Sequence, residues 1–250
     1  MMVMKRISLL IWVVAAVFSG CHTTRLTPAI EPGVFITLGD SIQPDPAAEQ
    51  LIAPYRTQLE AQTQEVIGNA TNDFTNAKPE GTLGNLFTDA MLWAAQQAQA
   101  PADIAYTNSG GLRVPLQAGP IQVGEVFEIM PFENRMVVLT LTGAQVDSLA
   151  QDLASINGEP VAGIRFVIQN DRATQIEIGG APLDRTKTYR VVTSDYLADG
   201  GSKSPVVRHP VSRQNLTVLL RDAALEYIRA ETKAGRSIVP KREGRIRKSS

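Results

Sequence analysis

The sequence predicts an α+β domain in which helices pack on a mixed β-sheet. Two observations support this prediction. Apolar and β-branched runs that are typical of strands alternate along the chain with amphipathic segments that are typical of helices. Two of the strand segments also lie close together, one ending near Ile168 and the next starting near Thr174. This hairpin spacing favours a mixed sheet over a purely parallel one.

The first 20 residues have the pattern of a signal peptide. A basic pair at 5–6 precedes an apolar run at 7–18. The run is too short to span a bilayer, because a transmembrane helix needs about 20 apolar residues. The small residues 19–20 then precede Cys21, which resembles a bacterial lipobox. We therefore expect lipidation of Cys21 and a lipoprotein anchored to the membrane on the periplasmic or surface side of the bacterial cell envelope. The alternative is an ordinary signal peptide with an incidental thiol.

Residues 21–46 are expected to form a tether, and residues 47–250 to form the folded domain. The tether is rich in Thr, Pro and Asp and shows no sustained periodicity. A helix is expected from Pro46, with Asp45 as its N-cap, and Pro54 within it implies a kink or a late start. One face of this helix carries Leu51, Ile52, Tyr55 and Leu59.

Helices and strands are then expected to alternate. A second amphipathic helix at about 83–99 faces inward with Leu83, Leu86, Phe87, Ala90 and Met91. Further helices are expected from Thr142, carrying Val146, Leu149 and Leu153, and at 216–232. Strands are expected at 103–107, 135–141, 163–168, 174–178 and 189–194, with a last short strand at 244–247.

Composition limits the classes of function. Removal of residues 1–20 leaves 22 basic against 25 acidic residues, a net charge of −3. Sequence-independent nucleic-acid binding needs clustered Lys and Arg to neutralise phosphates, so no nucleic-acid partner is expected. The single cysteine excludes an intramolecular disulfide.

Catalytic patterns are missing from the sequence. The two histidines, His22 and His209, have no partners at the spacing of metal ligands, so neither a metal site nor a cofactor is expected. A serine triad needs a positioned histidine, and Cys21 lies outside the expected domain. The glycine-rich segment 200–204 lacks the spacing of a phosphate-binding loop and is interpreted as a turn. The chain alone is therefore expected to be inactive as an enzyme.

Four segments carry a more specific signal. The sequence TNSGGLR at 107–113 follows a strand, and MPFEN at 130–134 precedes the next one. The other two are GTLGNLFTDA at 81–90 and the segment 191–201. In this order and spacing they resemble signatures of the C-terminal, substrate-binding domain of the 5'-nucleotidase family. The resemblance covers roughly residues 50–247.

The resemblance implies a binding role. In that family the C-terminal domain stacks a nucleotide base between two aromatic rings, while a separate N-terminal domain holds two metals and cleaves the phosphate ester. By position, Phe132 and Tyr196 would be the rings, Asn134 would read the base edge, and Arg113 would reach the ribose and phosphate. The alternative is that both rings are core residues. Further candidates for substrate binding are Asn85, Asn108 and Asp199, although Asn108 also suits a turn and Asn85 a helix start.

The sequence departs from the family at two places. Ser202 stands where the family typically has an aspartate that binds ribose hydroxyls, and Asp199 is a candidate replacement. Lys78 is the only basic residue in the region where the family usually has further arginines.

Three hypotheses follow for the function. The chain is a nucleoside- or nucleotide-binding subunit that acts with a separate metallophosphatase in nucleotide catabolism, a stand-alone nucleoside- or nucleotide-binding lipoprotein, or a structural envelope protein. The first is favoured slightly.

Overall fold

The computed structural model describes residues 45–249 of the chain. The expected signal peptide, Cys21 and almost all of the expected tether lie outside these residues. Residues 50–249 belong to one compact unit, and residues 45–49 belong to the unit that precedes it. Within the described range, no helix is both long and apolar enough to cross a membrane.

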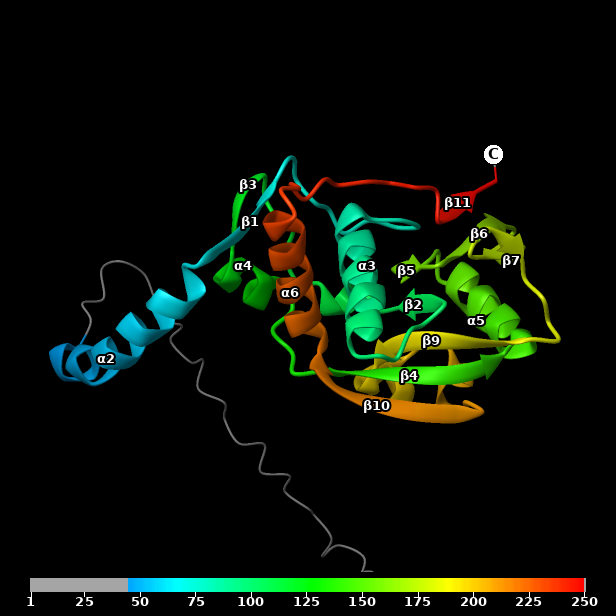
Figure 1. Cartoon of the computed structure of the whole chain (residues 1–250), viewed down its shortest axis with the longest axis horizontal. Coiled ribbons are helices and arrows are strands. Elements are labelled where there is room, and N and C mark those ends of the chain that lie inside the picture. The colour runs from blue at the N-terminus through cyan, green and yellow to red at the C-terminus, as the bar shows by residue number, and fades with distance from the viewer. Residues whose placement is uncertain (1–44, 250) are drawn as a thin grey trace, which may run out of the picture. The chain divides into compact units, whose positions relative to one another are not determined.

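The element order confirms an α+β fold (Figure 1). The α-helices of the described part are α2 (Pro46–Thr63), α3 (Thr82–Gln97), α4 (Val123–Ile129), α5 (Gly143–Ser155) and α6 (Leu220–Lys233). The strands are β1 (Val66–Ala70), β2 (Ile104–Tyr106), β3 (Gly119–Gln122), β4 (Arg135–Thr142), β5 (Val161–Ala162), β6 (Ile164–Gln169), β7 (Arg172–Ile178), β8 (Ala181–Pro182), β9 (Thr188–Ser194), β10 (Ser212–Leu219) and β11 (Ile246–Lys248).

The central sheet has the strand order β10-β4-β9-β2-β5. Strands β2 and β9 run parallel, whereas the other neighbours in this sheet are antiparallel. The predicted mixed sheet is therefore confirmed. A second sheet, β11-β6-β7-β8, contains the predicted hairpin, in which Ile168 pairs with Ala173. The predicted last strand is β11, which runs parallel to β6, and a small sheet pairs β1 with β3.

Two hydrophobic cores cover the two faces of the central sheet. Along β4, Met136 and Val138 join the core formed with α3 and α6, whereas Val137 and Leu139 join the core formed with α5. This alternation follows from the two-residue repeat of a strand. The sheet is thus held rigidly from both sides, and its ends are left to loops.

The predicted helices at α3 and α5 are confirmed. All five residues predicted to face inward on α3 are buried, as are the three on α5. At the start of α5, Gln145 N–H donates to Thr142 Oγ1 at 3.2 Å, and Thr142 N–H donates to Gln145 Oε1 at 2.9 Å. This reciprocal pair satisfies two backbone donors that the first turn of a helix leaves free.

Helix α2 begins at Pro46 without the late start considered above. The predicted N-cap is confirmed, because Asp45 Oδ1 accepts a hydrogen bond from Ala47 N–H at 2.8 Å. Pro54 lies within the helix. The apolar face is exposed to between 41% and 72%, a set made up of Leu51, Ile52, Tyr55 and Leu59.

The prediction of a helix at 216–232 placed its start four residues too early. Residues 216–219 are the end of strand β10, and α6 begins at Leu220. The apolar residues of β10 run directly into those of α6, so the sequence shows no break between them. Elements β1, β3, β5, β8, β10 and α4 were not expected from the sequence.

Candidate functional site

Three loops meet at one edge of the central sheet. Strands β2 and β9 are parallel, so both end at this edge, and the antiparallel β4 starts there. The register places Met136, near the start of β4, opposite Ser194 at the end of β9. The loops that follow β2, precede β4 and follow β9 are therefore neighbours. They contain the predicted residues Arg113, Phe132, Asn134 and Tyr196, and the further candidates Asn108 and Asp199.

The loop after β2 forms a tight turn. Gly111 N–H donates to Asn108 O at 3.1 Å, and a Cβ on Gly111 would lie 3.3 Å from Asn108 Oδ1. Asn108 therefore shapes the turn, as the sequence suggested. Arg113 is exposed at its end, and its Nη1 donates to Gly110 O at 3.1 Å. Arg113 N–H also donates to Ile129 O at 2.9 Å, which joins this turn to the end of α4.

Two polar side chains from distant segments hold the same turn. Asn76 Nδ2 donates to Ser109 O at 2.8 Å and to Leu112 O at 3.3 Å. Ser109 N–H donates to Glu159 Oε2 at 2.6 Å. These residues were missed in the sequence, because they lie 33 and 50 positions from Ser109 and nothing local marks them. They fix the backbone from which Arg113 extends.

The basic residue noted before α3 also contacts this support. Lys78 Nζ lies 3.0 Å from Glu159 Oε1 and donates to Ile156 O at 3.1 Å. Its charge is thus committed to Glu159. Lys78 neutralises the carboxylate next to the turn, which leaves Arg113 as the cation that extends from the turn itself.

Phe132 and Tyr196 are surface residues. Their exposed fractions are 41% and 53%, so the alternative that both are core residues is wrong. The ring of Tyr196 lies over Gly201, where a Cβ would come within 2.3 Å of the ring. Only glycine leaves room for the ring there. Stacking of a base between Phe132 and Tyr196 stays a prediction.

Asn134 lies two positions after Phe132 in the chain and is half-buried. Its carbonyl accepts a hydrogen bond from Leu220 N–H at 2.9 Å, which joins the loop to the start of α6. Its side-chain amide forms no hydrogen bond with the other residues that the structure describes. An amide has both donors and an acceptor, so this group is available to read the edge of a base.

The loop after β9 has Ser202 where the resembled family typically has an aspartate, and Asp199 is the candidate replacement. Ser202 is buried, and its Oγ lies 3.0 Å from the hydroxyl of Tyr106 and accepts a hydrogen bond from Ser204 N–H at 2.9 Å. Asp199 forms an ion pair with Arg213 of β10. The hydrogen bonds and charge of Arg213 hold the pKa of Asp199 below its ordinary value. Neither side chain is left free to bind a ligand hydroxyl in this arrangement.

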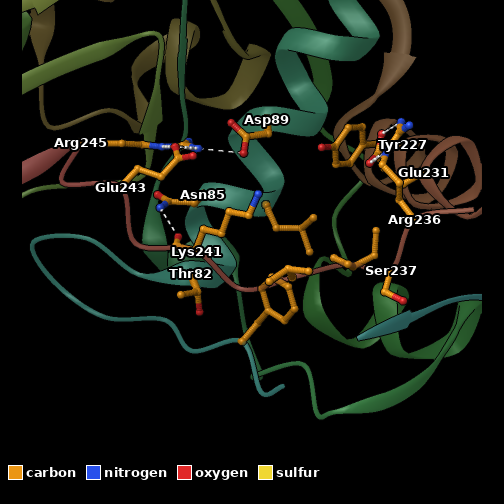
Figure 2. Close-up of a pocket in the computed structure, with 14 residues that line it drawn as sticks. Thr82, Asn85, Asp89, Tyr227, Glu231, Arg236, Ser237, Lys241, Glu243 and Arg245 are labelled. Atoms are coloured by element: carbon orange, nitrogen blue, oxygen red, sulfur yellow. Dashed lines mark hydrogen bonds and ion pairs between the residues drawn. The ribbon is translucent and has the colours of Figure 1, made fainter. Parts of the chain in front are cut away.

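Asn85 lies apart from the other candidates. It is 5% exposed, and its Nδ2 donates to Glu80 Oε1 at 2.7 Å and to the backbone oxygen of Lys241 at 2.9 Å (Figure 2). It lines a separate cavity of about 530 Å³ between α3, α6 and the C-terminal segment. None of Arg113, Phe132, Asn134 and Tyr196 lines that cavity. The structure thus brings six of the seven candidates to loops at one sheet edge, and Asn85 to another place.

Metal ligands do not gather in the part of the chain that the structure describes. No group of three or more His, Cys, Asp or Glu residues between 45 and 249 is arranged to hold a metal ion.

The comparisons with a family model and with individual proteins agree on one family. The model of the 5'-nucleotidase, C-terminal domain family matches residues 66–209. The trifunctional nucleotide phosphoesterase protein YfkN of Bacillus subtilis is 31% identical over 234 residues, which cover 85% of this chain and 16% of that protein. Protein UshA of Escherichia coli is 27% identical over 160 residues, or 62% of this chain and 29% of that protein.

The fold agrees with a solved structure of the same kind. The 5'-nucleotidase precursor from Thermus thermophilus superimposes with a TM-score of 0.69 and 29% sequence identity, over 81% of this chain and 43% of that chain. The chain therefore spans less than half the length of each of these relatives.

Proposed function

Since this chain belongs to the family of 5'-nucleotidase C-terminal domains, we propose that the loops at the edge of its central sheet bind a nucleoside or nucleotide. The observation that carries the proposal is the pair of exposed rings, Phe132 and Tyr196, on adjacent loops of this edge. Single exposed apolar residues are common on protein surfaces, but aromatic rings exposed together on adjacent loops are typical of a binding surface. Two of them beside an unbonded amide suit a planar, polar ligand.

Each side chain has a distinct task in the proposed complex. The rings of Phe132 and Tyr196 stack on the two faces of the base, and one such contact contributes about 1 to 3 kcal/mol. The amide of Asn134 exchanges hydrogen bonds with the edge of the base. The guanidinium of Arg113 meets the sugar or a phosphate, for which its planar fork is suited.

The binding domain is proposed to act with a metallophosphatase that another chain supplies, in nucleotide catabolism. Two findings support this step. The matched relatives are two to six times longer than the matched region, and one of them is named a nucleotide phosphoesterase. The candidate site also contains Arg113, neutral groups and Asp199, which is paired with Arg213, and the described residues hold no cluster of ligands arranged for a metal ion. Hydrolysis is therefore assigned to the partner and ligand capture to this chain.

Location at the membrane of the bacterial cell envelope is part of the same proposal. It is supported by the signal-like residues 1–20 and by Cys21 directly after two small residues. A diacylglycerol on Cys21 would keep the domain near the membrane, because several acyl chains bind far more firmly than one.

A stand-alone binding or structural envelope lipoprotein is the second candidate, and one observation favours it. Ser202 is committed to Tyr106, and Asp199 to Arg213, so neither side chain is free for ribose hydroxyls. A domain that has lost its ligand would show the same features. Measured affinity separates the structural protein from the two binding proteins, and the effect on a metallophosphatase separates the binding subunit from the stand-alone binding protein.

Calorimetric titration of the full-length chain with adenosine, AMP and a nucleotide sugar tests the proposal. We expect saturable binding of at least one of them and no release of phosphate from AMP by the chain alone in the presence of Mn²⁺. Addition of a metallophosphatase encoded next to this chain should then raise the rate of AMP hydrolysis. Absence of binding by all three ligands would favour the structural candidate.

A further inference from the structure

The cavity that Asn85 lines shares no lining residue with the proposed nucleotide site. Its volume of about 530 Å³ lies within the range of roughly 300 to 1,000 Å³ that small-molecule sites occupy. Helix α3 forms one wall, α6 the opposite wall, and the segment that leads to β11 closes it (Figure 2). The cavity holds an unusual density of charge, contributed by Asp89, Glu231, Glu243, Arg236, Lys241 and Arg245.

The three carboxylates in this cavity are already paired with arginines. Arg245 Nη2 lies 2.8 Å from Asp89 Oδ2 and 2.8 Å from Glu243 Oε2. Arg236 binds Glu231 through two hydrogen bonds, at 2.7 Å and 2.6 Å. The carboxylates of the lining are therefore paired with its arginines. A cationic ligand would find no unpaired carboxylate to bind.

Lys241 is the cation that remains. Within the described residues its ammonium group forms no hydrogen bond or ion pair. Burial raises the pKa of Asp89 and the charge of Lys241 offsets a small part of this rise, whereas the hydrogen bonds of Arg236, with a small contribution from Lys241, lower the pKa of Glu231. In Figure 2 its side chain extends towards Asp89, and the residue is exposed to solvent. An ammonium group offers three donors, and none of them is used by the protein here.

The hydroxyl of Tyr227 faces the same space from the opposite wall (Figure 2). Burial, with the charges of Glu231 and Asp89, raises the pKa of Tyr227, so its hydroxyl stays protonated and can donate. The side chain has no hydrogen bond within residues 45–249. The unused polar groups on both walls are therefore donors, and the matching ligand group is an acceptor with negative charge.

Apolar side chains complete the lining. Leu86 and Ile238 form part of the wall beside Lys241 and Tyr227, and both are largely buried. The arginines are paired with the three carboxylates of the lining, so Lys241 is the one unpaired positive charge, and it matches a single negative charge on a ligand. A ligand with one negative charge and an apolar carbon skeleton matches both the charge and the apolar side chains of the lining.

We propose that this cavity is a second binding site, independent of the nucleotide site, for a small organic monocarboxylate. The carboxylate of the ligand accepts hydrogen bonds from Lys241 Nζ and Tyr227 Oη, and its apolar body rests on Leu86 and Ile238. The paired arginines keep the three protein carboxylates away from the ligand. Nothing in this arrangement involves Phe132 or Tyr196.

Ligand-detected NMR with butyrate as the probe tests the site on the full-length chain in mild detergent. We expect saturable binding of butyrate and at least tenfold weaker binding of butyramide, which has the same shape without the charge. Lys241→Met should weaken butyrate binding about tenfold, and Tyr227→Phe about threefold. Lys248→Met, at an exposed lysine of β11, is the matched control and should leave the affinity unchanged.

Each contrary result would overturn the site. Equal binding of butyrate and butyramide, full affinity in Lys241→Met, or no saturation by butyrate at about 50 mM would do so. Lys241→Met is expected to keep the thermal midpoint of the parent, because its amine has no partner in the fold. Tyr196→Ala should bind butyrate like the parent, so failure of the nucleotide site and failure of this site are distinguishable.

Discussion

The carboxylate of Asp195 accepts a hydrogen bond from the backbone N–H of Arg135 at 3.1 Å. The same oxygen accepts one from Tyr196 N–H at 2.7 Å. Asp195 therefore joins the end of β9, where Tyr196 begins its loop, to the start of β4, directly after the loop that carries Phe132 and Asn134. One side chain thus sets the relation between the two parts of the proposed base site.

Asp195→Ala should weaken nucleoside binding about threefold to tenfold without removing any group that contacts the ligand, because the two loops lose a shared anchor. The free energy of unfolding should fall by only about 1 kcal/mol, since the bonds lie at a partly exposed sheet edge. Calorimetry and urea unfolding measure the two effects. Glu128→Ala, at an exposed acid of α4, serves as the control and should change neither quantity.

Ionisation of the buried Tyr106 hydroxyl should lower the stability of the fold at alkaline pH. Burial raises the pKa of Tyr106 from 10.0 to about 12. The folded state then holds this proton more firmly than the unfolded state. The contribution is fully present below pH 10 and is lost as the pH rises towards 12.

The difference in unfolding free energy between the parent and Tyr106→Phe should therefore shrink by about 2 to 3 kcal/mol between pH 9 and pH 12. Chemical denaturation over this range measures it, and the Phe variant corrects for other groups that titrate. A difference that stays constant with pH would show that Tyr106 ionises normally.

Arg245 and Arg221 are both buried, with 5% and 7% exposure, but their replacement should change the free energy of unfolding by very different amounts. Arg245 donates to Glu243, Thr88, Val161 and Asp89 and anchors the C-terminal segment. Arg221 instead stacks on Phe127 at 3.9 Å, and its Nε has no hydrogen-bond partner in residues 45–249.

Arg245→Met should cost about 2 to 3 kcal/mol of unfolding free energy, because the hydroxyl of Thr88 and the carbonyl of Val161 lose a buried donor and the partly exposed carboxylates of Asp89 and Glu243 lose their partner. Arg221→Met should change that free energy by less than about 1 kcal/mol, since only a cation–π contact is exchanged for apolar contact. Urea unfolding of the two variants, measured side by side, checks the order. A larger loss for Arg221→Met would contradict it.

Sequence periodicity was sufficient for the elements that bury one clear face. Strands β4 and β9 and helices α3 and α5 carry such patterns, and all are present near the expected bounds. Strands β1 and β3 were missed, because β1 contains Gly68 and Asn69 and β3 begins with Gly119 and Pro120. Residues of this kind disfavour strands. The two strands also lie about 50 positions apart in the sequence, so their pairing leaves no local pattern.

The site was predictable to the extent that its residues follow strand ends. The positions of Arg113, Phe132 and Tyr196 on loops of one edge follow from the strand order. The support by Asn76 and Glu159, and the commitment of Asp199 to Arg213, depend on folded contacts that no local pattern marks. Asn85 was expected near a site, but its side chain donates to Glu80, just before α3, and to the backbone oxygen of Lys241 in the C-terminal segment.

Cys21 is proposed to carry the membrane anchor, so Cys21→Ser should release the protein from membranes. The reason is that the thiol is the acceptor of the lipid, and the apolar run before it is too short to hold a span of the bilayer. Fractionation of cells followed by a carbonate wash measures the release. If the Ser variant stays in the membrane fraction as firmly as the parent, the proposed anchor is excluded.

The base clamp is the centre of the account, and a double-mutant cycle on Phe132 and Tyr196 tests it most directly. Affinity for the best-bound nucleoside is measured by calorimetry for the parent, Phe132→Ala, Tyr196→Ala and the double variant, with Tyr55→Ala, at an exposed ring of α2, as the control. We predict that each single variant loses about 1 to 3 kcal/mol of binding free energy, that the two losses are not additive because both rings contact one base, and that the control binds like the parent. Unchanged nucleoside affinity in both single variants, with the parent binding saturably, would contradict the clamp.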